Sequence, residues 1–180
     1  MLNQAMLPLA FRGPLMRAAL VLGLLVICTG PAQGQEANHQ ETELGAVNFN
    51  ASCSTQEFDH ALAFFHHMQY EESRAAFERI VGTDPECGMA HWGIAMTLFQ
   101  PLWPTRPGPE ALRRGWEEVQ KAQDLGTGSD RDANLLSAAE AFFRDPETAD
   151  WWTRIRSWSE AMDRAYRESP EDMETAALYA

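Results

Sequence analysis

Prolines divide the chain from residue 54 onward into segments, and the apolar residues within these segments have the spacing of amphipathic helices. Three proline dipeptides preceded by such segments are Asp84-Pro85, Asp145-Pro146 and Ser169-Pro170. Proline cannot continue a helix and biases the residue before it away from helical geometry, so these dipeptides predict helix ends. We find no alternating apolar and polar run that favours a strand. The predicted fold class is therefore all-α, with helices in antiparallel pairs.

Seven helices are expected from these patterns. Their approximate ranges are 54–68, 71–81, 87–99, 109–125, 129–143, 148–168 and 173–180. Ser54 and Glu57 match a capping box at the start of the first helix. Residues 100–109 contain four prolines, which predicts a stiff loop and not a helix.

Residues 1–34 predict a cleaved signal peptide. Arg17 precedes the apolar run 18–27, and the small residues Ala32 and Gly34 fit a signal-peptidase site. An uncleaved anchor is the alternative, but the run is short for a membrane span. Residues 35–52 are polar and are expected to be a flexible lead-in. The predicted location is periplasmic or extracellular, which is an oxidising compartment, with no membrane contact after cleavage.

The expected mature chain is strongly acidic. The whole sequence holds 26 acidic and 14 basic residues, and the leader contains two of the bases, Arg12 and Arg17, and none of the acids. Twelve bases would then face 26 acids, a net charge of 12 − 26 = −14. Such a surface repels phosphate backbones, so we do not expect a nucleic-acid partner.

The segment Met68-Gln69-Tyr70-Glu71-Glu72-Ser73 resembles the turn between the two helices of a tetratricopeptide repeat. Counted from this turn, Ala61 falls on the small position of the first helix and Phe77 on the large apolar position of the second. Pro85 falls on the terminal proline, and Ala95 repeats the small position in the next unit. Within the repeat, Ser73 departs from the usual alanine.

The resemblance to tetratricopeptide repeats covers residues 54–180 and is strongest over 54–99, although His91 stands where tryptophan is common. A narrower resemblance, carried by residues 52–54, 84–87, 89–96 and 101–103, is to a group of bacterial exported tetratricopeptide proteins of largely unknown function. It implies a fold and a compartment, namely an exported solenoid of stacked helix pairs, but no reaction. Because a curved stack of helices presents an extended groove to a peptide or protein, we expect a binding module without catalysis of its own. Because the final segment is apolar enough to require a further helix, we expect the chain to be a fragment of a longer solenoid.

Cys53 and Cys87 are separated by 87 − 53 = 34 residues, which is the length of one repeat. In an oxidising compartment this pair predicts a disulfide, with free thiols or a metal site as alternatives. Cys87 and His91 lie four residues apart on one helix face, so Cys53, Cys87 and His91 form the candidate metal-ligand set. We find no catalytic triad, phosphate-binding loop or zinc-protease motif, and we expect no cofactor.

Trp103, in the proline-rich loop, is the candidate partner-binding residue. A stiff loop loses little entropy when it docks, and an exposed tryptophan is an effective anchor. The alternative is that Trp103 folds back between the helices. The tryptophans expected in the core are Trp116, Trp151, Trp152 and Trp158.

The predicted function is that of an exported scaffold which binds a protein or peptide partner. Two alternatives remain open at this point: a metal-binding exported protein, and an accessory domain of a longer protein.

Overall fold

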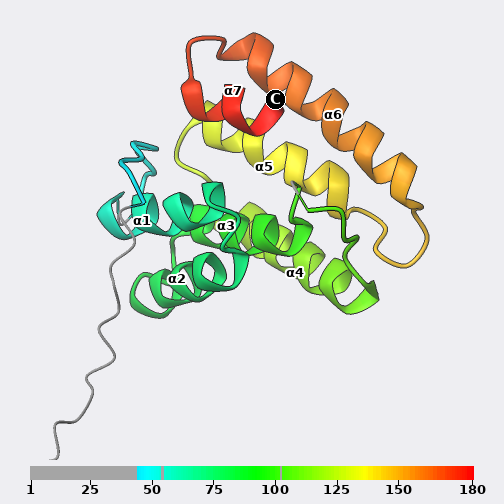
Figure 1. The fold of residues 1–180 in the computed structure, drawn as a ribbon, viewed down its shortest axis with the longest axis horizontal. Coiled ribbons are helices and arrows are strands. Elements are labelled where there is room, and N and C mark those ends of the chain that lie inside the picture. The colour runs from blue at the N-terminus through cyan, green and yellow to red at the C-terminus, as the bar shows by residue number, and fades with distance from the viewer. Residues whose placement is uncertain (1–43, 54, 102) are drawn as a thin grey trace, which may run out of the picture. The chain divides into compact units, whose positions relative to one another are not determined.

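The computed structural model describes residues 44–53, 55–101 and 103–180 (Figure 1). These residues form seven helices and no strand: α1 (Thr55–His66), α2 (Tyr70–Thr83), α3 (Gly88–Phe99), α4 (Pro109–Leu125), α5 (Asp130–Phe143), α6 (Trp151–Glu168) and α7 (Met173–Tyr179). The all-α prediction is confirmed. The predicted signal peptide, the first half of the predicted lead-in (35–43) and Ser54 of the predicted capping box lie outside the described residues. None of the described helices has the length and apolar character needed to span a membrane.

Each helix packs against the next one in chain order. Helix α3 makes further contacts with α1 and α5, so alternate helices also touch. Helix pairs joined by a short or stiff connection, such as α1 with α2 and α5 with α6, run side by side (Figure 1). The irregular segment before α1 adds Phe49 and Ala51 to the core.

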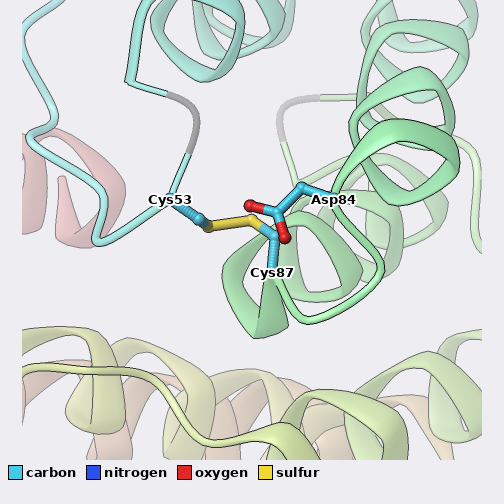
Figure 2. A group of neighbouring side chains, drawn as sticks. All are labelled: Cys53, Asp84 and Cys87. Carbon is cyan, nitrogen blue, oxygen red and sulfur yellow. A yellow bond between two sulfur atoms is a disulfide. The ribbon is translucent and has the colours of Figure 1, made fainter.

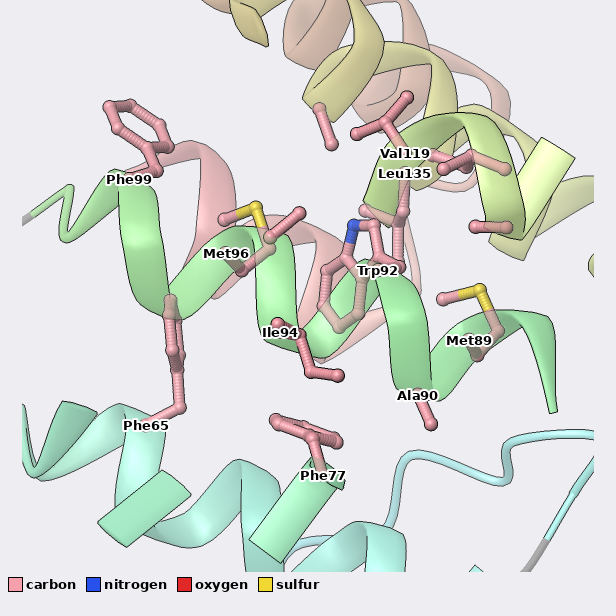
Figure 3. Packing of buried hydrophobic residues seen from close by; sticks show 14 of the residues in the cluster. Phe65, Phe77, Met89, Ala90, Trp92, Ile94, Met96, Phe99, Val119 and Leu135 are labelled. Carbon is pink, nitrogen blue, oxygen red and sulfur yellow. The ribbon is translucent and has the colours of Figure 1, made fainter. Parts of the chain in front are cut away.

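Helix α3 is the centre of the packed core, and all of its residues are buried. Figure 3 shows Phe65 and Phe77 approaching α3 from one side, and Val119 and Leu135 from the other. Trp92 is fully buried and its ring stacks on that of Phe49 at a centroid distance of 5.7 Å. A helix that is apolar on every side requires neighbours on every side, which explains why α3 contacts α1, α2, α4 and α5.

Ser73, near the start of α2, connects this helix to α1. The Ser73 side chain is fully buried, and its hydroxyl donates a 2.8 Å hydrogen bond to the carbonyl oxygen of Ala61. A buried hydroxyl without a partner would be costly. The bond satisfies the serine and joins the two helices where they approach most closely. Met68, two residues after the end of α1, adopts a left-handed backbone conformation with φ 58°, which is typical of a residue that follows a helix.

Helix α6 begins later than the predicted start near Thr148. Its first residue is Trp151, because the Asp150 side chain caps the helix and accepts hydrogen bonds from the backbone N–H groups of Trp152 and Thr153, at 2.9 and 3.2 Å. The start of α5 agrees with the sequence pattern, since Ser129 accepts a hydrogen bond from the backbone of Asp132.

The prediction that four tryptophans lie in the core is wrong for Trp152, whose side chain is 66% exposed. The buried face of α6 carries Arg154, Trp158, Ala161, Met162 and Ala165, and position 152 lies off this stripe. Trp158 is buried as expected, whereas Trp116 and Trp151 are half-buried and pack against the edge of the core.

Candidate functional site

The two cysteines of the described chain lie together, as their spacing predicts. The Cα atoms of Cys53 and Cys87 are 5.5 Å apart and their sulfur atoms are at disulfide distance (Figure 2). Equivalent points on packed helices are about 8–10 Å apart, which is too far for a disulfide. The non-helical position of Cys53 removes this difficulty, because Cys53 precedes α1 and reaches Cys87 at the N-terminus of α3.

His91, the third residue of the predicted metal-ligand set, is directed elsewhere. Its Nδ1 lies 2.5 Å from Oε2 of Glu118, and both residues are buried, with 7% and 6% of their surfaces exposed. Lys121 donates a 2.9 Å hydrogen bond to the other carboxylate oxygen of Glu118. The partner of His91 is therefore a carboxylate on α4, and not the backbone group that a packed histidine more often has.

The pKa of Glu118 is lowered from its ordinary value. Burial is the largest influence and by itself raises the pKa, because it penalises the charged form. The hydrogen bonds from His91 and Lys121, together with the positive charge of Lys121, outweigh burial. Glu118 is consequently a carboxylate at neutral pH, held between α3 and α4.

The structure brings a different group of possible metal ligands together. Among the described residues, one atom each from Cys53, Asp84 and Cys87 lies within 4.8 Å of the other two (Figure 2). Asp84 ends α2, and its carbonyl oxygen accepts a hydrogen bond from the backbone N–H of Cys87 at 3.1 Å. Sequence reasoning treated Asp84 only as part of a helix stop. Its position three residues before Cys87, in a tight turn, was the signal for this proximity.

The loop from Gln100 to Gly108 leads from α3 to α4. Gln100 adopts a left-handed conformation that ends α3, and its carbonyl accepts a 3.0 Å hydrogen bond from the backbone N–H of Trp103. The Trp103 side chain is 49% exposed, so it does not fill a space between the helices. The alternative that it folds back into the core is contradicted by this exposure.

Arg106 attaches the same loop to the first turn of α6. Its guanidinium carbon lies 5.1 Å from the ring centroid of Trp151 and 5.8 Å from that of Trp152. A guanidinium at these distances is attracted by the ring faces. We call the four residues Trp103, Arg106, Trp151 and Trp152 the tryptophan surface; only Trp151 among them is half-buried.

The described chain also contains a cavity of about 540 Å³ on α1 and α2. It is lined by two carboxylates, an imidazole, a guanidinium, a hydroxyl and two apolar side chains: Glu57, Asp84, His60, Arg79, Thr83, Ala76 and Ile80. Asp84 belongs both to this cavity and to the cysteine cluster.

The neighbouring histidines His66 and His67 contact different partners. His66 Nε2 is 2.8 Å from a carboxylate oxygen of Glu174, which connects the end of α1 with α7. His67 Nε2 is 3.0 Å from the carbonyl oxygen of Leu44. They do not form a pair for acid–base chemistry.

Comparison of the chain with protein-family models, with curated proteins and with solved structures found no match.

Proposed function

We propose that residues 54–180 form a tetratricopeptide-like stack of helix pairs, which holds a protein or peptide partner and performs no catalysis. Three features support the stack. Consecutive helices pack in chain order, α3 contacts both α1 and α5 as first helices of successive repeats do, and Ser73 bonds Ala61 at the close approach within the first pair. Each pair leaves an apolar face that its neighbour covers.

The observation that carries the binding role is the exposure of Trp103 and Trp152. Large aromatic side chains normally bury most of their area, and 49% and 66% of these two remain exposed. Trp103 lies in a loop that contains several prolines, and Arg106 holds that loop on α6. Partner binding would thus bury much apolar area while freezing few additional bonds.

We place the protein outside the cytoplasm. The leader composition of residues 1–34 supports export, and a pair of cysteines at disulfide distance is typical of exported proteins. N-terminal sequencing of protein recovered from the envelope or the medium of the source cells should read from Gln35. A sequence beginning upstream of residue 18 would contradict cleavage.

The partner-binding proposal is tested by affinity capture from the envelope fraction of the source cells. The wild-type chain is compared with the Trp103→Ala/Trp152→Ala double variant, and captured proteins are identified by mass. We expect at least one protein to be retained by the wild type and lost by the double variant. That protein, purified, should bind the wild type directly.

A matched control removes an exposed apolar side chain outside the tryptophan surface. Leu125, at the end of α4, is 42% exposed, and Leu125→Ala should capture the same partner as the wild type. Equal capture by all three proteins would contradict a binding role for the tryptophan surface.

A further inference from the structure

The geometry points to a metal site that is blocked while the Cys53–Cys87 disulfide is intact. When this bond is reduced, the two sulfurs and the Asp84 carboxylate bind one thiophilic divalent cation, and Zn²⁺ fits best. The three ligand atoms already lie within 4.8 Å of one another (Figure 2). Two thiolates and a carboxylate are ligands that Zn²⁺ accepts, and water can occupy the fourth tetrahedral position.

Only small movements separate the disulfide form from a metal site. Zn–S bonds of about 2.3 Å and Zn–O bonds of about 2.0–2.2 Å place tetrahedral ligand atoms roughly 3.3–3.8 Å apart. After reduction the sulfurs must separate by somewhat less than about 2 Å from disulfide distance. Cys53 lies in the irregular segment before α1 and not inside a helix, so it can make this movement without disturbing α3.

The surroundings favour charged ligands at this place. Cys87 is the N-cap of α3, where the positive end of the helix dipole favours a thiolate over a thiol. The bond from the Cys87 backbone N–H to the Asp84 carbonyl holds the two residues in one turn. Cys53 and Asp84 are half-buried and so keep contact with solvent, and Asp84 also lines the 540 Å³ cavity.

The redox step is balanced by a dithiol. The dithiol supplies two electrons and two protons, the Cys53–Cys87 bond breaks to give two thiols, and the dithiol closes to its own disulfide. Zn²⁺ then replaces the two thiol protons, which are released to solvent. Exchange with the disulfide form of the dithiol reverses the sequence: the Cys53–Cys87 bond forms again, the dithiol is regenerated with two protons from solvent, and Zn²⁺ is released because a sulfur in a disulfide is no longer a thiolate ligand. The cysteine pair would therefore bind metal only under reducing conditions.

The test uses Co²⁺ as a spectroscopic substitute for Zn²⁺ in the full chain. Cys28, which lies outside the described residues, is replaced by serine in every protein so that only Cys53 and Cys87 supply sulfur. The chain is reduced with a dithiol, freed of it without air, and titrated. We expect thiolate-to-cobalt charge-transfer absorption that saturates at one ion per chain, and no such absorption from the oxidised chain.

Asp84→Asn separates a metal ligand from a residue that merely ends α2. Asparagine keeps the shape but is a much poorer ligand, so we expect Co²⁺ affinity to fall at least about tenfold. Glu86→Gln is the matched control, since Glu86 is an exposed acid two residues away and should leave the affinity unchanged. Circular dichroism of the reduced chain, with and without Co²⁺, records whether the helices persist.

Three results would overturn the site. The reduced chain could show no thiolate–cobalt absorption. Asp84→Asn could bind Co²⁺ as tightly as Glu86→Gln does. The reduced chain could lose its helices and fail to regain them with Co²⁺. None of these results bears on the tryptophan surface, so the binding role and the metal site fail separately.

Discussion

A charged group between helices α3 and α4 is compensated by its immediate neighbours. The Glu118 carboxylate is contacted on one oxygen by His91 and on the other by Lys121. A buried carboxylate with fewer partners would bind a proton instead of staying charged. The pKa of Glu118 is lowered because the interactions with these partners stabilise the charged form by more than burial destabilises it.

Glu118→Gln should lower the free energy of unfolding at pH 7 by about 1.5–3 kcal/mol, which is the range for a hydrogen bond to a charged group. Because the folded pKa of Glu118 is depressed, its contribution is present above the ordinary value of 4.5 and is lost as the pH falls through the folded value. The difference between the two proteins should therefore shrink below about pH 4.5. Urea titrations across pH 3–7 measure it.

The control for this change is the next residue along α4. Glu117 is exposed, so Glu117→Gln should alter the free energy of unfolding by less than about 0.5 kcal/mol at any pH in that range. Equal effects of the two substitutions, or a Glu118→Gln effect that does not depend on pH, would contradict the proposed charge compensation.

At the level of single residues, sequence reasoning found the pairs set by spacing and missed those set by packing. Cys53 and Cys87 are 34 residues apart, which is the length of one repeat in the proposed stack, so their proximity was predictable. The approach of Glu118 to His91 depends on how α4 packs on α3. The length of the loop between these helices does not determine which of their residues lie opposite each other. The exposure of Trp152 depends on the rotation of α6, whose first residue is Trp151 and not the predicted Thr148.

Between elements, the contact of α4 with α5 depends on the absence of a side chain at Gly115. A Cβ atom there would overlap the ring of Phe143. Both residues are buried, and Phe143 is fully so. The two helices can therefore approach more closely at this point than alanine would permit.

Gly115→Ala should destabilise the protein by about 1–3 kcal/mol, the usual cost of forcing extra atoms into a packed core. The change acts against helix propensity, which favours alanine by about 1 kcal/mol. Gly82→Ala, near the end of α2, is the comparison, because nothing lies within 4 Å of a Cβ atom there. It should be neutral or stabilising by up to about 1 kcal/mol. Thermal unfolding of both variants measures these changes. A stabilised Gly115→Ala protein would show that α4 and α5 are packed less closely than the position of Phe143 indicates.

Most elements were predictable because proline, glycine and capping residues mark their ends. Pro109 at the first position of α4 and Gly126 after its last are examples. The long connection from α3 to α4 was predicted as a loop, but its attachment to α6 was not, because nothing in the sequence pairs Arg106 with Trp151. Interactions between distant elements are decided by packing, and a single sequence does not encode them in a readable pattern.

For the molecule as a whole, the disulfide ties the segment before α1 to the central helix α3. It closes a loop of 34 residues, so replacing Cys53 and Cys87 by alanine should cost roughly 2–4 kcal/mol of unfolding free energy. Denaturant titration under non-reducing conditions measures the loss. Dithiol reduction of the wild type should produce a similar loss. Identical midpoints for the oxidised wild type and the double variant would mean that no bond forms between these residues.

The proposed role of the whole molecule is to hold a partner through the tryptophan surface, and Trp103→Ala tests it most directly. Binding of the purified partner and the melting temperature are measured on the same preparation. Because 49% of Trp103 is exposed, we predict that binding weakens by more than about 1 kcal/mol, roughly fivefold in Kd, while the melting temperature moves little. A protein that melts much earlier yet binds its partner with unchanged affinity when folded would contradict the proposal.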